Sequence, residues 1–193
     1  SMGVPIRRLM LATNENNVLE EFFTTGIYRP RSAADTLATS SPSMDISKAS
    51  NLERFIWALL GPEAFVQRWA ELESTGTLDL RDQLPRLGKN FGFVAGTSSH
   101  ADRLEAIRSV KERSGRLIDP HTADGVTVAL RTMEPGFPTL VMETAKAAKF
   151  PQTVAEALGT EPETPAVIAD LLARPQKVET IDNEEAPLRH LIE

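Results

Sequence analysis

The sequence predicts an α/β fold, in which short buried strands alternate with amphipathic helices. Two apolar runs, residues 6–12 and 91–96, have the length and composition of buried strands. Each is followed by a segment with helical spacing of apolar residues, such as Leu104, Ile107 and Val110. A strand followed directly by a helix is the repeating unit of α/β domains, so we expect three to four strands with flanking helices.

Start and stop residues set the bounds of the predicted helices. Gly26, Gly115 and Gly159 are positioned to end helices, and Asp119-Pro120 is positioned to start one. The predicted helices, in chain order, are 13–25, 51–75, 98–114, one that starts at 120, 150–158, 165–172 and 184–191. The other predicted strands are 139–142 and a candidate edge strand at 177–180, while 78–89 is interpreted as a short strand and a short helix.

The composition is that of a globular protein. The chain has 193 residues, of which 41% are hydrophobic and 25% charged, which is enough for a domain with a real core. A net charge of -6 argues against a nucleic acid or an anionic membrane surface as a partner. The absence of cysteine excludes disulfides and fits a reducing compartment, so we expect a cytoplasmic protein.

A polar segment at residues 40–51 joins two well-patterned regions. It holds five serines together with Asp45 and Lys48, and Arg29 and Arg31 lie shortly before it. Hydroxyl groups combined with cations suit an anion such as phosphate. The alternative is an ordinary polar loop that ends in a helix cap, because Ser50-Asn51-Leu52-Glu53 fits a capping box.

Two further positions are candidates for ligand contact. Thr13 and Asn14 follow the strand 6–12, and ligands of α/β sheets lie beyond the carboxyl ends of strands. A helix N-cap explains the same two residues equally well. His121 lies in the first turn of a helix, where the positive end of the helix dipole favours a neutral imidazole. Local packing is its alternative role, and no metal site is expected because the histidines lack ligand spacing.

Five blocks of the sequence resemble threonine synthases and occur in the family's order. They are LATNEN at 11–16, TGIYRPR at 25–31, SSPSMDISKASN at 40–51, IDPHTADG at 118–125, and META at 142–145 followed by AKF at 148–150. The resemblance is to the C-terminal part of the family only. It implies that residues 1–193 are a single α/β fragment of a larger protein. The residues at the start of the chain, 1–3, are interpreted separately as a cloning remnant.

The resemblance implies a fold and an activity for the whole protein. The fold would be the C-terminal part of the large domain of fold-type-II, tryptophan-synthase-β-like enzymes that use pyridoxal phosphate. The enzyme would be a carbon–oxygen lyase of threonine biosynthesis, converting O-phospho-L-homoserine and water to L-threonine and phosphate. No lysine here matches the family's Schiff-base lysine, so no catalytic residue is assigned. The fragment alone is expected to be inactive and to bind no cofactor covalently.

Family residues carry over to several positions. Thr144, at the end of the predicted strand 139–142, matches the hydroxyl that meets the pyridine nitrogen of the cofactor, and a helix N-cap is its alternative role. Lys146-Ala147 stands where the family commonly has His-Pro. The substrate-side candidates are Thr13, Asn14, Arg29, Arg31, Ser41, Ser43, Asp45, Lys48 and His121.

Two other functions are compatible with these residues. One is a non-catalytic binding module on the same scaffold, which the absent lysine favours. The other is a related dehydratase that uses pyridoxal phosphate, although such enzymes are not expected to carry the block at 40–51. A fragment of an α/β domain also exposes a sheet edge and an apolar face, so we expect self-association.

Overall fold

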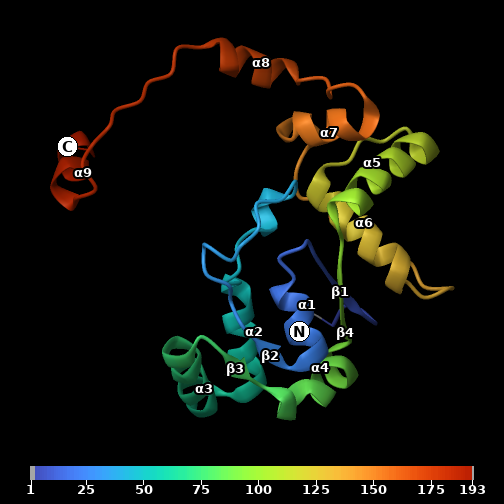
Figure 1. Cartoon of the computed structure of the whole chain (residues 1–193), viewed down its shortest axis with the longest axis vertical. Coiled ribbons are helices and arrows are strands. Elements are labelled where there is room, and N and C mark those ends of the chain that lie inside the picture. Colours follow the sequence, from blue (N-terminus) through green and yellow to red (C-terminus); the bar gives the residue numbers. More distant parts are fainter. Residues whose placement is uncertain (1–2, 193) are drawn as a thin grey trace. The chain divides into compact units, whose positions relative to one another are not determined.

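The computed structural model describes residues 3–192, which fall into two units. The boundary between them in the sequence lies between Pro162 and Glu163. Each unit is described by itself, and the elements are labelled in Figure 1. The strands are β1 (Leu9–Thr13), β2 (Ile27–Tyr28), β3 (Leu78–Asp79) and β4 (Phe93–Thr97). The helices of the first unit are α1 (Val18–Thr25), α2 (Ser50–Leu60), α3 (Pro62–Thr75), α4 (Leu84–Phe91), α5 (His100–Ser114), α6 (Pro120–Thr132) and α7 (Pro151–Leu158). Among the described helices, none has the length and apolar character that a membrane crossing requires.

A parallel pair of strands organises the first unit. β1 and β4 run side by side in a register that pairs Leu9 with Phe93 and Thr13 with Thr97. Their carboxyl ends therefore lie at the same edge, and helices α1 and α5 follow from it. Gly92 ends α4 with a φ of 67°, and a Cβ there would lie 2.5 Å from the Arg7 carbonyl oxygen. A residue without a side chain is needed for this close approach of α4 to the start of β1.

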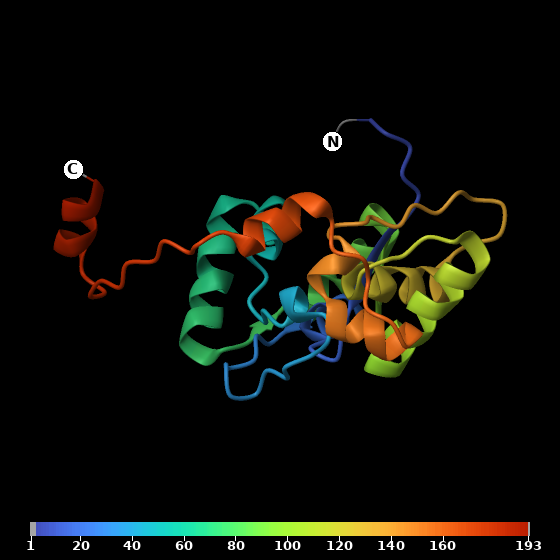
Figure 2. The same cartoon turned by 90° about the horizontal axis from the view of Figure 1, so that it is seen from above.

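Two apolar clusters stabilise this unit. The first surrounds Phe22 of α1 and Ile56 of α2, both fully buried, and it includes Tyr28 and Leu78 of the small antiparallel pair β2–β3. The second fills the space between α5, α6 and α7, around Ile107. Figures 1 and 2 show these three helices side by side at one end of the unit. The clusters hold the two strand ends and α6 in fixed relative positions.

Most predicted elements are confirmed within a few residues. α6 begins with Asp119 as N-cap and Pro120 in its first turn, and Gly115 and Gly159 end α5 and α7. The segment 78–89 holds the short β3 and the start of α4. In the second unit, the structure has α8 (Ala166–Ala173) and α9 (Glu185–Ile192), neither of which contains a buried residue. That residues 1–193 are one fragment of a larger protein stays a prediction.

One predicted helix start and one predicted helix cap are wrong. Thr13 pairs with Thr97 and is the last residue of β1, while α1 begins later, after Asn17. The capping box at 50–53 does not form either. Ser50 is already inside α2, Ala49 is the N-cap, and the cap has no side-chain hydrogen bond. Strand pairing of Thr13 moves the start of α1 along the chain, whereas α2 begins within one residue of the predicted start and lacks only the predicted cap.

Two predicted strands are also wrong. Residues 139–142 and 177–180 have irregular backbone. A strand is stable only when a neighbouring strand accepts and donates its backbone hydrogen bonds, and the described residues supply none there. Leu140 and Met142 are 88% and 75% exposed as a result.

Candidate functional site

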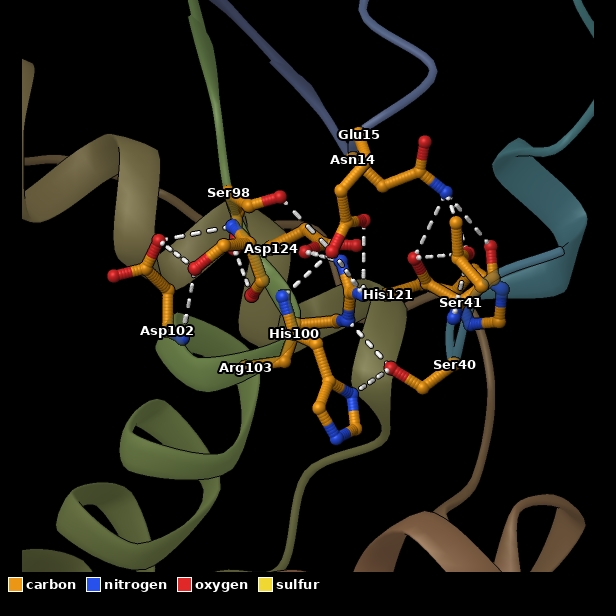
Figure 3. Close-up of polar contacts among 12 residues, drawn as sticks. Asn14, Glu15, Ser40, Ser41, Ser98, His100, Asp102, Arg103, His121 and Asp124 are labelled. Carbon is orange, nitrogen blue, oxygen red and sulfur yellow. Dashed lines mark hydrogen bonds and ion pairs between the residues drawn. The ribbon is translucent and has the colours of Figure 1, made fainter. Parts of the chain in front are cut away.

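A polar cluster lies at the carboxyl ends of β1 and β4. Figure 3 shows Asn14 and Glu15 directly after β1, and Ser98 directly after β4. Ser40 and Ser41 approach the same edge from the loop between β2 and α2. This is the edge at which α/β proteins bind their ligands.

Asn14 holds the loop against the end of β1. Its side chain is fully buried, and its Nδ2 group donates to Thr39 Oγ1 at 2.8 Å, Ser41 Oγ at 3.1 Å and Asp45 Oδ1 at 2.8 Å. Its Oδ1 accepts the backbone N–H of Asn16 at 2.8 Å. That local bond ends the strand and turns the chain. The structure therefore brings together three substrate-side candidates: Asn14, Ser41 and Asp45.

Asp45 closes the loop from its other end. Oδ1 accepts bonds from Asn16 Nδ2 at 2.9 Å and from Thr39 Oγ1 at 2.8 Å, and Oδ2 accepts the Thr39 backbone N–H at 2.8 Å. Both carboxylate oxygens are thus engaged within the protein. In this geometry Asp45 holds the loop in place through both carboxylate oxygens.

Arg103 is the centre of the site, and the sequence analysis missed it. Its side chain is fully buried in α5, and Nη2 donates to both carboxylate oxygens of Glu15 at 2.9 Å. Nη1 donates to Asp124 Oδ1 at 3.1 Å, and Nε donates to Ser40 Oγ at 2.7 Å. Arg103 therefore links the end of β1, the loop at Ser40 and helix α6 through direct hydrogen bonds.

Asp124 is a second buried titratable residue of the cluster. Its Oδ2 is buried and has no hydrogen-bond partner among the described residues. Burial raises the pKa of Asp124, because removal from water disfavours the charged carboxylate. The Ser41 hydroxyl, the Arg103 guanidinium and the Ser98 hydroxyl oppose that shift. The cluster of Arg103, Glu15 and Asp124 carries more negative than positive charge when both acids are ionised.

A cavity of about 390 Å³ opens beside this cluster. Its lining consists of Glu15, Leu37, Ala38, Thr39, Ser40, His100 and Arg103. The start of the polar segment 40–51 therefore borders a cavity. Glu15, His100 and Arg103 carried no sequence signal of their own, apart from Glu15 belonging to the block at 11–16.

His121 holds the same loop in place through a hydrogen bond to the loop backbone. Its Nε2 accepts the backbone N–H of Ser43 at 3.0 Å, and its Nδ1 lies 2.8 Å from Asp119 Oδ1. A backbone N–H can only donate, so Nε2 carries no hydrogen and Nδ1 donates to Asp119. The ring is therefore neutral, as its place at a helix N-terminus predicts. Burial acts to raise the pKa of Asp119, but hydrogen bonds from His121 and Thr122 outweigh it and lower that pKa.

The two candidate arginines differ in what they contact. Arg29 forms an ion pair with Glu21. Among the described residues, Arg31 donates only to neutral oxygens, namely the Glu15 carbonyl at 3.2 Å and Asn17 Oδ1 at 2.6 Å, with Asn16 Oδ1 at 3.4 Å. The positive charge of Arg31 is thus not cancelled by a bonded carboxylate.

None of the predicted site residues is part of the cavity lining itself. Thr13 Oγ1 donates to the Gly96 carbonyl at 3.1 Å and bridges the two strands, and Lys48 is exposed. Thr144 is exposed in irregular backbone, so its predicted place at the end of a strand is wrong. Its alternative role as a helix N-cap is also wrong, because Lys146 precedes the short turn at 147–149.

Comparisons with known proteins identify the family. Residues 122–192 match the family model described as threonine synthase, C-terminal. Threonine synthases of Methylobacillus glycogenes and Corynebacterium glutamicum are each 48% identical to the chain, over 99% of this chain and 41% of those proteins. The chain thus spans about two fifths of the length of these relatives.

Solved structures agree with the sequence comparisons. The PLP-bound threonine synthase from Brucella melitensis superposes with a TM-score of 0.87 at 34% identity, over 99% of this chain and 41% of that one. Threonine synthase from yeast superposes with a TM-score of 0.83 at 28% identity, over 99% and 42%. These matches confirm the predicted α/β fold class. By family model, sequence and fold, the chain belongs to the threonine synthase family and corresponds to the C-terminal part of its members.

Proposed function

We propose that this chain is the C-terminal part of an enzyme that converts O-phospho-L-homoserine and water to L-threonine and phosphate. The observation that carries the proposal is the alignment of 99% of the chain with threonine synthases at 48% identity. Pyridoxal phosphate would supply an electron sink for the reaction. We propose that the protein works in the cytoplasm and takes a small-molecule substrate.

The lysines of the chain support a division of labour within the whole enzyme. A lysine that forms a Schiff base is usually activated in a desolvated pocket. The lysines of this chain are all exposed: Lys48, Lys89, Lys111, Lys146, Lys149 and Lys177. We therefore propose that the lysine and the phosphate-binding loop lie in another part of the protein. Thr144 is exposed, and its hydroxyl makes no hydrogen bond within the described residues, so it is free to meet the pyridine nitrogen.

The site supports a direct test of this function. The full-length protein is incubated with pyridoxal phosphate and O-phospho-L-homoserine, and both phosphate and threonine are quantified. We expect equal amounts of the two products from the full-length protein and neither from this chain alone. A dehydratase would instead release ammonia from threonine or serine, and a binding module would turn over neither substrate. A stoichiometric, borohydride-reducible cofactor adduct on one lysine of this chain alone would contradict the division of labour.

Arg31 is the cation best placed to attract the anionic substrate. Its guanidinium is held by neutral oxygens next to the loop that Asn14 anchors, whereas Arg29 is neutralised by Glu21. Ser43 and Lys48 are exposed on the same loop and are free to contact a ligand. Asn14, Ser41, Asp45 and His121 would act by fixing the loop, and Thr13 by fixing the strand end.

In the full-length enzyme, Arg31→Met is expected to raise KM for the substrate about tenfold or more, because a charge-assisted hydrogen bond contributes about 1.5–3 kcal/mol. Turnover at saturating substrate should change less, since the chemistry is carried out elsewhere. Arg29→Met is the matched control, and it should leave KM within about twofold because the charge of Arg29 is already paired with Glu21 and Arg29 itself is exposed. Steady-state kinetics on both variants measure KM and turnover and show whether Arg31 contributes to substrate binding. Equal effects of the two substitutions would remove Arg31 from the substrate side.

Self-association of the isolated chain is a further part of the proposal. The segment 137–142 presents apolar side chains to solvent, with Phe137 51%, Leu140 88% and Met142 75% exposed. Contiguous exposed apolar surface favours association. Light scattering over a dilution series should show a mass above that of one chain, and Leu140→Glu should lower it. A monomer at every concentration would contradict the proposal.

A further inference from the structure

Ser40, His100 and Glu156 form a continuous hydrogen-bonded chain beside the cavity. Ser40 Oγ lies 2.8 Å from His100 Nδ1, and His100 Nε2 lies 2.9 Å from Glu156 Oε1. Ser40 and His100 both line the cavity of about 390 Å³, and Figure 3 shows Ser40 between the His100 ring and Arg103. Glu156, on α7, is exposed and is the last member of this series of hydrogen bonds.

The partners of Ser40 fix the direction of these hydrogen bonds. A guanidinium N–H can only donate, so the 2.7 Å contact from Arg103 Nε makes Ser40 Oγ an acceptor. When His100 carries its single ring hydrogen on Nε2, Nδ1 accepts the hydroxyl hydrogen of Ser40. An ionised carboxylate can only accept, so His100 Nε2 carries a hydrogen and donates it to Glu156 Oε1.

We propose that Ser40 is an activated nucleophile that reacts with small activated acyl or phosphoryl groups entering the cavity. His100 accepts the hydroxyl proton, and Glu156 orients the ring and stabilises its cation. The Arg103 N–H stabilises the negative charge that develops on Ser40 Oγ. None of these steps involves the cofactor or the substrate of the proposed lyase reaction.

The reaction with a phosphoryl fluoride balances as follows. Ser40 Oγ forms a bond to phosphorus, the P–F bond breaks, and fluoride leaves with its electron pair. The hydroxyl proton passes to His100 Nδ1 and from there to solvent. With an activated ester, Oγ bonds to the carbonyl carbon, the alcohol leaves with the proton, and water later releases the acid.

The test uses the complete 193-residue chain and diisopropyl fluorophosphate, with labelled peptides identified by mass spectrometry. We expect one label, on Ser40, and none on the exposed neighbour Ser43. His100→Gln keeps a hydrogen-bonding side chain but removes the base, and it should slow labelling about a hundredfold. Glu156→Gln should slow labelling less. Glu105→Gln, an exposed acid on α5 paired with Arg108, is the control that should change nothing.

Two results would overturn the proposal. One is a chain with native circular dichroism in which Ser40 stays unlabelled. The other is labelling of Ser40 at an unchanged rate in a folded His100→Gln variant, which would show that the imidazole takes no proton from it. Ser40→Ala serves only as the blank for the label, so a folding defect in that variant does not affect the comparison.

Discussion

Replacing Arg103 with methionine is expected to lower the free energy of unfolding by about 3–5 kcal/mol, the usual cost of removing one partner from a buried ion pair. Arg103 is fully buried and bonds Glu15 and Asp124, so the substitution leaves Asp124 buried without any counter-charge. Methionine fills a similar volume, which separates the loss of charge from the loss of packing. Urea unfolding followed by circular dichroism measures the change.

The control for this prediction lies on the same helix. Arg108 is 40% exposed and pairs with Glu105, so Arg108→Met should cost no more than about 1 kcal/mol. Adding Asp124→Asn to Arg103→Met should recover part of the loss, because it removes the uncompensated buried charge. A variant of Arg103 as stable as the native chain would mean that the ion pairs contribute nothing net, and the site would then be held by its apolar clusters.

Replacing Asn14 with aspartate is expected to cost more than about 3 kcal/mol at pH 7. The substitution keeps the shape of the side chain but removes both Nδ2 hydrogens, and a lost buried hydrogen bond alone costs about 1–3 kcal/mol. It also sets a second carboxylate against Asp45 Oδ1, which lies 2.8 Å from Asn14 Nδ2. Two carboxylates at that distance repel each other, and the pKa of one of them rises.

The pH dependence of this variant distinguishes repulsion from a simple packing defect. A group whose pKa is higher in the folded protein stabilises the fold at low pH and ceases to do so as the pH rises through that value. The Asn14→Asp variant should therefore regain stability between pH 7 and pH 5, measured by urea unfolding against the native chain at each pH. Asn51→Asp, at an exposed position in the first turn of α2, is the control and should stay within about 0.5 kcal/mol. A loss that is independent of pH would contradict the repulsion.

Local signals predicted the helices well because helix ends depend on nearby residues. Asp119-Pro120 and Gly115 act through backbone geometry and hydrogen bonds within one turn, and the structure has both ends where they indicate. The strand prediction at 139–142 failed because a strand depends on a partner elsewhere in the chain. Leu140 and Met142 have strand-like neighbours in sequence but none in space among the described residues.

The candidate site divides in the same way. The polar composition of 40–51 and the position of Asn14 after a strand indicated residues that the structure joins through direct hydrogen bonds. Arg103 gave no such indication, because in sequence it is one charged residue on an amphipathic helix. Its partner Glu15 is 88 positions away, so only folding shows that the two charges compensate each other.

The amino-acid sequence by itself determined the α/β class, most helix bounds, the neutral state expected for His121 and the resemblance to threonine synthases. These properties follow from hydrophobic periodicity, capping chemistry and residue order, all of which are local. The tertiary structure decided which charges are buried, which loop residues border the cavity, and that Ser40 contacts both Arg103 and His100. Burial and hydrogen bonding between distant segments set those properties, because desolvation makes a charge costly unless folding brings its partner to it.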